Sequence, residues 1–104
     1  MKTLFLVTRI RGLAWDISKP MNSQEQWSEH ATFMNRLAAE GFVVLGGPVD
    51  ESGDILLVVD AADESEIDTI LLRDPWSQSG ILEIKTIKWW TVLLQAGERT
   101  EGNS

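Results

Sequence analysis

The chain has 104 residues, of which 43% are hydrophobic and 24% are charged, and these values are typical of a single globular domain. Nine basic and sixteen acidic residues give a net charge of −7, which argues against a nucleic-acid partner. Because the chain has no cysteine and one histidine, His30, it has no disulfide, no cysteine nucleophile and no multi-histidine metal site of its own.

Residues 3–10 are rich in β-forming residues and contain no breaker, which predicts a first strand. The apolar run within them is too short for a signal peptide. No apolar stretch of the chain is long enough to cross a membrane. We therefore expect a cytoplasmic protein with no membrane contact. Residues 11–22 contain Gly12 and Pro20 and are expected to form a loop.

A helix is predicted to follow this loop. Ser23 and Gln26 have the spacing of a capping box, and Gly41 stands where a helix usually ends. Apolar residues recur at helical spacing between these signals, at Trp27, Ala31, Met34, Leu37 and Ala38.

Two strands of the buried type come next, at residues 42–45 and 55–59. We expect Gly46-Gly47-Pro48 to end the first of them, with a polar turn at residues 50–54. Asp63 and Glu66 then form a second capping-like pair, which starts a helix whose apolar face is Ile67, Ile70 and Leu71.

The second helix is expected to end at Asp74, because the residue before a proline disfavours helical geometry. Residues 81–90 are predicted to form the last strand. The order is then β-α-β-β-α-β. Right-handed crossovers give this order a ferredoxin-like α+β fold, a four-stranded antiparallel sheet with two helices on one face. Residues 1–95 make one domain, and residues 96–104 are expected to be a flexible tail.

The two central apolar strands predict a partner for the open face of the sheet. Strands without polar alternation are usually buried on both faces, whereas the two helices can cover only one. A homodimer that packs sheet against sheet is the simplest cover, at about 10 Å spacing. A loop or the C-terminal segment that folds across the sheet is the alternative.

His30 and Asp74 are the two candidate catalytic residues. His30 falls inside the apolar stripe of the first predicted helix, where a histidine is either structural or an acid–base group. Asp74 lies in a loop that can approach that helix, and an aspartate bonded to one imidazole nitrogen would make the other a general base. The alternative for Asp74 is ordinary turn chemistry before a proline.

Several other residues are candidates for binding a small molecule. Gly47 and Pro48 follow a strand and form either the floor of a pocket or a sharp turn. Trp15 and Trp76 are the tryptophans expected in loops, where they can line a ligand site. The remaining candidates are Arg9 at the pocket wall and Ser79 in the loop that contains Asp74.

The sequence resembles the YCII-related (YciI-like) domain family from about residue 3 to residue 90. The resemblance rests on the Glu29–Met34 segment around His30, on Leu45-Gly46-Gly47-Pro48, and on Asp74-Pro75-Trp76 followed by Ser79-Gly80. It implies a ferredoxin-like dimer of the dimeric α/β-barrel kind, with His30 and Asp74 in the active site. It also implies lyase-like chemistry, for which dehalogenation of a small aromatic compound is the precedent.

Two hypotheses about function follow. The first is an enzyme without cofactor or metal that performs acid–base lyase, isomerase or dehalogenase-like chemistry on a small cyclic or aromatic substrate. The second is a dimeric module that binds a small ligand without converting it. Because ferredoxin-like scaffolds serve many functions, the fold does not choose between them.

Overall fold

The computed structural model of the chain describes residues 2–97. The sheet strands are β1 (Lys2–Arg11), β2 (Val43–Val49), β3 (Asp54–Val59) and β4 (Leu82–Val92). The helices are α1 (Trp27–Ala39), α2 (Glu64–Leu71) and α3 (Pro75–Ser79), preceded by a single 3₁₀ turn, η1 (Met21–Ser23). Most of the tail predicted at residues 96–104 lies outside the described residues.

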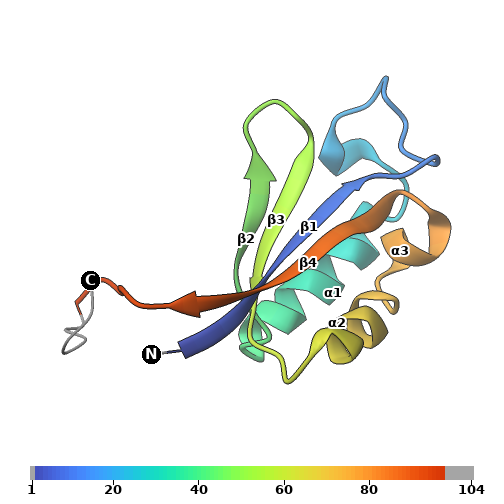
Figure 1. The fold of residues 1–104 in the computed structure, drawn as a ribbon. Helices are drawn as coiled ribbons and strands as arrows, with labels where there is room; N and C mark the ends of the chain where they lie inside the picture. Colours follow the sequence, from blue (N-terminus) through green and yellow to red (C-terminus); the bar gives the residue numbers. More distant parts are fainter. Residues whose placement is uncertain (1, 98–104) are drawn as a thin grey trace.

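The four strands form one antiparallel sheet in the order β2-β3-β1-β4. Figure 1 shows the three helices together on one side of this sheet. The predicted ferredoxin-like α+β fold is therefore confirmed. Within residues 2–97, none of the helices has the length and apolar character that a membrane crossing requires.

The two faces of the sheet have different environments because neighbouring residues of a strand point to opposite sides. Phe5 and Val7 of β1 point toward the helices and belong to the main hydrophobic core. Leu57 and Val59 pair with them across β3 and belong to the same core. The intervening residues face away from the helices, so the sheet has one covered and one open face.

Helix α1 begins later than the sequence predicts. The expected capping box is wrong, because Ser23 ends the 3₁₀ turn and no side chain caps the helix. Instead, Gln26 takes a left-handed conformation with φ of 59° immediately before Trp27. The buried Gln24 side chain holds the preceding loop, since its amide donates to the carbonyls of Asp16 and Lys19.

Strand β2 continues through Gly46-Gly47-Pro48 to Val49, so the prediction that these residues end the strand is wrong. A proline is tolerated here because β2 is an edge strand. Gly46 lies close to the core, because a Cβ atom there would lie 2.7 Å from Cδ2 of the buried Leu57 and that side chain would have to shift. Gly47 is different, since a Cβ atom there would meet nothing within 4 Å.

The segment between β3 and β4 contains two helices rather than one. As predicted, Asp63 caps α2 by accepting a hydrogen bond of 2.9 Å from the backbone N–H of Glu66. The helix ends at Leu71, and the chain then starts α3 at Pro75. Asp-Pro is therefore a helix start, because proline suits the first helical position and aspartate suits the cap before it.

The two neighbouring glycines of β2 give a test of this packing. We expect Gly46→Ala to be less stable than Gly47→Ala by about 1 kcal/mol or more, because only the first added methyl meets a buried side chain. Urea unfolding of the two variants measures the difference, and the effect of alanine on the unfolded chain is common to both. Equal stabilities would contradict the close contact between Gly46 and Leu57.

Candidate functional site

The site is built around the carboxylate of Asp74, which is fully buried. Asp74 is the N-cap of α3, and its Oδ1 accepts a hydrogen bond of 2.9 Å from the backbone N–H of Trp76. The carboxylate also accepts hydrogen bonds from Arg9 of β1 and from His30 of α1. One side chain therefore joins the sheet, the first helix and the third helix.

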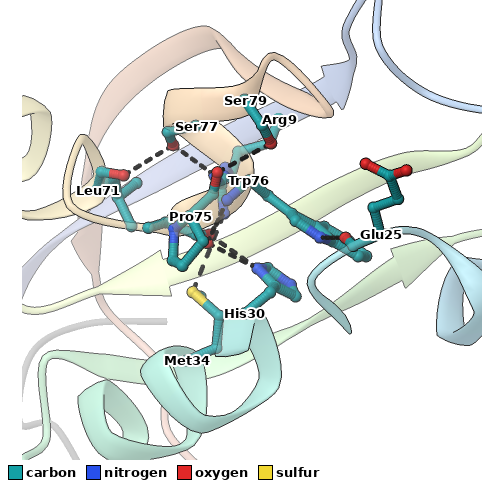
Figure 2. A network of polar contacts seen from close by, with 10 residues as sticks. Arg9, Glu25, His30, Met34, Leu71, Pro75, Trp76, Ser77 and Ser79 are labelled. Carbon is teal, nitrogen blue, oxygen red and sulfur yellow. Dashed lines mark hydrogen bonds and ion pairs between the residues drawn. The ribbon is translucent and has the colours of Figure 1, made fainter. Parts of the chain in front are cut away.

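His30 projects from α1 toward α3, as Figure 2 shows. Its Nδ1 lies 2.9 Å and 2.8 Å from the two carboxylate oxygens of Asp74. Because an ionised carboxylate only accepts hydrogen bonds, Nδ1 must carry a proton. In the neutral ring Nε2 then holds a lone pair, and within residues 2–97 it has no hydrogen-bond partner.

The surroundings of Asp74 decide its ionisation. Burial by itself would raise the pKa of the carboxyl. The hydrogen bonds from His30 and from the Trp76 backbone, together with the charge of Arg9, outweigh burial and hold the pKa of Asp74 below its ordinary value. The group is therefore a carboxylate at neutral pH, and so Nδ1 of His30 is the donor in the hydrogen bond between them.

Arg9 is the third member of the cluster and is 1% exposed. Its Nη1 donates to Oδ2 of Asp74 at 2.9 Å and contacts Sδ of Met34 at 3.9 Å. Its Nη2 donates to Oγ of Ser77 at 2.8 Å, whereas its buried Nε has no partner among the described residues. A β-bulge shifts the register of β1 against β4 between Thr8 and Arg9, and bulges of this kind redirect a side chain.

Trp76 lies against the imidazole ring and is fully buried. The two rings are stacked, with centroids 3.8 Å apart and planes inclined by 6°. The indole Nε1 donates a hydrogen bond of 2.6 Å to the carbonyl of Glu25, which fixes the indole next to the start of α1. The imidazole is thus held by a hydrogen bond at one edge and by an aromatic ring on one face.

A cavity of about 340 Å³ opens beside His30, between α1 and β2. This volume is in the range of small-molecule sites. Most of the lining is apolar, and Arg9 and His30 are the two ionisable side chains among the described residues that line it. The α1 wall consists of Trp27, His30, Ala31, Met34, Asn35 and Ala38, and the β2 wall runs from Val43 to Pro48.

The structure brings six of the eight candidate residues together. His30 and Asp74 are hydrogen-bonded, Arg9 joins them, and Trp76 stacks on His30. Gly47 and Pro48 line the cavity through β2.

Trp15 and Ser79 lie outside this cavity. Trp15 packs edge-on against the indole of Trp76 with centroids 5.9 Å apart, so it supports the wall from behind. Ser79 is exposed, and its hydroxyl donates to the carbonyl of Pro75. The structure therefore separates Ser79 from the other candidates.

Other residues of the site were not singled out from the sequence. Ser77 accepts from Arg9 and donates to the carbonyl of Leu71, and nothing in its sequence context indicates this. Trp27 and Met34 belong to the predicted apolar stripe of the helix, most of which lines the cavity, whereas Leu37 of that stripe packs into the core. Their helical spacing with His30 was the available signal.

Comparison with known protein families identifies the family of the chain. The model of the YCII-related domain family matches residues 1–91, which include every helix and all but the last residue of β4. No curated protein matches the chain. The family match confirms the resemblance inferred from the sequence.

The lowered pKa of Asp74 predicts an acid-sensitive contribution to stability. A carboxyl whose pKa is lower in the folded than in the unfolded protein stabilises the fold at pH values above its unfolded-state pKa. This stabilisation is lost as the pH falls through the folded-state pKa. We expect Asp74→Asn to cost about 3–5 kcal/mol at neutral pH, because Arg9 is left buried without its counter-charge. The difference from wild type should shrink as the pH falls below the ordinary aspartate pKa of about 3.9 and through the lower pKa of the folded protein, where the wild-type carboxyl gains a proton.

Urea unfolding at neutral pH and at a series of acidic pH values measures this effect. Asp68→Asn is the matched control, since it removes an exposed carboxylate from α2. A stability difference between wild type and Asp74→Asn that is independent of pH would contradict a buried, ionised Asp74.

Proposed function

Because the chain belongs to the YCII-related domain family, we propose that it is a cofactor-independent enzyme that performs acid–base chemistry on a small molecule. His30 is the general base and acid. Asp74 orients its ring and favours its protonated form. The observation that carries this proposal is the hydrogen bond of 2.8 Å between Nδ1 of His30 and Asp74, which leaves Nε2 for a molecule in the cavity.

The chemistry that this arrangement supports is proton transfer. Nε2 takes a proton from a carbon or oxygen of the substrate, and the electron pair of the broken bond stays on the substrate. The imidazolium that results donates from Nδ1 to the carboxylate of Asp74 at 2.8 Å, which stabilises its charge. Nε2 then returns the proton at another substrate atom or to a leaving group, which gives isomerisation or elimination.

The cavity supports a small cyclic or aromatic substrate. Trp27, Met34 and Leu57 offer flat and polarisable apolar surface, and the bare backbone of Gly47 allows close approach from β2. Arg9 was expected to bind substrate, and its bonds to Asp74 and Ser77 favour a positioning role instead. Pro48 closes the wall near the end of the strand.

A binding module without turnover is the second candidate. The observation that favours it is the mainly apolar lining, in which Arg9 and His30 are the ionisable side chains among the described residues. Such a cavity holds an apolar ligand whether or not a proton moves. The two functions differ in one outcome, because only the enzyme converts the molecule that it binds.

We also propose that the chain forms a homodimer through the open face of its sheet. Leu6 and Leu45 both pair with Val58, so the three side chains share the face that the helices leave uncovered. Leu45 and Trp90 on this face are 67% and 41% exposed. Exposed large apolar side chains on an uncovered sheet face are characteristic of an interface.

The tautomer of His30, the single histidine, tests whether Nε2 can act as the proposed base. Long-range ¹H–¹⁵N NMR of the imidazole should show a proton on Nδ1 and none on Nε2 in wild type at mildly alkaline pH. In Asp74→Asn we expect a mixture of tautomers, because the amide can donate as well as accept. A wild-type ring that is protonated on Nε2 would remove the proposed base.

Turnover of a substrate found by screening distinguishes the enzyme from the binding module. We expect His30→Gln and Asp74→Asn each to lower the rate by about 10²–10⁴-fold, which is the usual value of a positioned acid–base group. Ser79→Ala is the control, because its hydroxyl lies outside the cavity. Unchanged turnover in both dyad variants would exclude the proposed mechanism.

Sedimentation of a double variant tests the dimer. Leu45→Glu with Trp90→Glu adds two charges to the open face and should give a monomer where wild type sediments as a dimer. The matched control is Leu13→Glu with Ile17→Glu, which changes two exposed apolar residues of the loop after β1. A monomeric wild type would exclude the dimer.

A further inference from the structure

We propose that the cavity between α1 and β2 selects uncharged molecules and rejects carboxylates, phosphates and organic cations. This inference rests on the site assigned above and adds the charge class of its ligand. It is carried by the way in which the charges of the cluster are paired.

An arginine in a ligand cavity ordinarily indicates that an anion binds there. Most donors of Arg9 are already bonded to the protein, and the side chain is only 1% exposed. Its Nη1 donates to Asp74 at 2.9 Å and contacts the sulfur of Met34, and its Nη2 donates to Ser77 at 2.8 Å. Its Nε is buried beyond the reach of solvent. The guanidinium therefore forms part of the wall and is not a binding group.

The charges of Arg9 and Asp74 also cancel each other. Asp74 is a carboxylate behind the cavity wall, and the guanidinium of Arg9 neutralises it at 2.9 Å. In the form that carries a single proton, on Nδ1, the imidazole of His30 adds no charge. Among the described residues, Arg9 and His30 are the ionisable side chains of the lining, so the neutral form of the site has no counter-charge for an ion.

The remaining lining makes an ion costly. The walls contributed by α1 and β2 are mainly apolar, with Trp27, Met34 and Leu57 among them. Transfer of an ion from water into such surroundings without a partner is strongly unfavourable, whereas a neutral molecule loses little. The net charge of −7 also repels anions as they approach.

This arrangement predicts that a single change reverses the selectivity. Asp74→Asn keeps the shape of the residue and removes its charge, so the positive charge of Arg9 is left without a partner beside the cavity. The site should then prefer an anion. Arg9→Gln has the opposite effect, because it leaves the carboxylate of Asp74 without its guanidinium, and the site should then prefer a cation.

Three probes of one shape and different charge test the proposal. Benzoate, benzamide and benzamidine are planar isosteres that carry a negative charge, no charge and a positive charge. Their dissociation constants are measured at mildly alkaline pH by quenching of tryptophan fluorescence, since Trp27 and Trp76 line the cavity. Shifts of the ring signals of His30, the one histidine, locate the bound probe.

Wild type should bind benzamide at least about tenfold more tightly than either ion. In Asp74→Asn, benzoate should bind at least about tenfold more tightly than benzamide. In Arg9→Gln, the affinity for benzamidine should rise relative to the affinity for benzamide. Glu83→Gln is the matched control for Asp74→Asn, since it makes the same charge change at an exposed position of β4 and should keep the wild-type order.

The wild-type series decides the proposal even where a variant fails to fold. Equal affinities, a preference for either ion, or no saturable binding by any probe would overturn it. Selective binding of benzamide supports it whether or not the protein turns over a substrate. Unchanged turnover in the His30 and Asp74 variants would exclude the proposed enzyme mechanism. It would not change the order in which the three probes bind.

Discussion

The structure of the site depends on a single buried carboxylate. Asp74 receives hydrogen bonds from Arg9, from His30 and from the backbone of Trp76, and so it joins β1, α1 and α3. A buried carboxylate is stable only when it is paired and hydrogen-bonded. Each of its partners is therefore fixed in place, and the tautomer of the imidazole follows from the same requirement.

Helix α1 connects this cluster to the rest of the fold through two faces. Phe33 and Leu37 pack into the core, whereas Ala31 and Met34 line the cavity. His30 lies between the two faces, where its ring reaches both the buried carboxylate and the open space. A binding site next to a core is possible here because one helix contributes to both.

Much of this fold could be predicted from the sequence because its signals are local. Apolar periodicity gave the order of the elements, and Asp63 capped its helix as predicted. Ser23 and the end of β2 were predicted wrongly, because a buried Gln24 and an edge position override local preference there. The end of the second helix was also predicted wrongly, because Asp74-Pro75 starts a third helix. The pairing of His30 with Asp74 was a hypothesis, and the bonds of Arg9 across 65 positions of the chain have no local signal.

The division of α1 into two faces has a consequence for the substitutions that this protein can tolerate. The small residues Ala31 and Ala38 face the cavity and make no part of the main core cluster. Larger side chains at these positions would fill the cavity from its helical wall, while Phe33 and Leu37 continue to hold the helix on the sheet. The size of the accepted molecule can therefore vary along a lineage, or by design, at little cost in folding free energy.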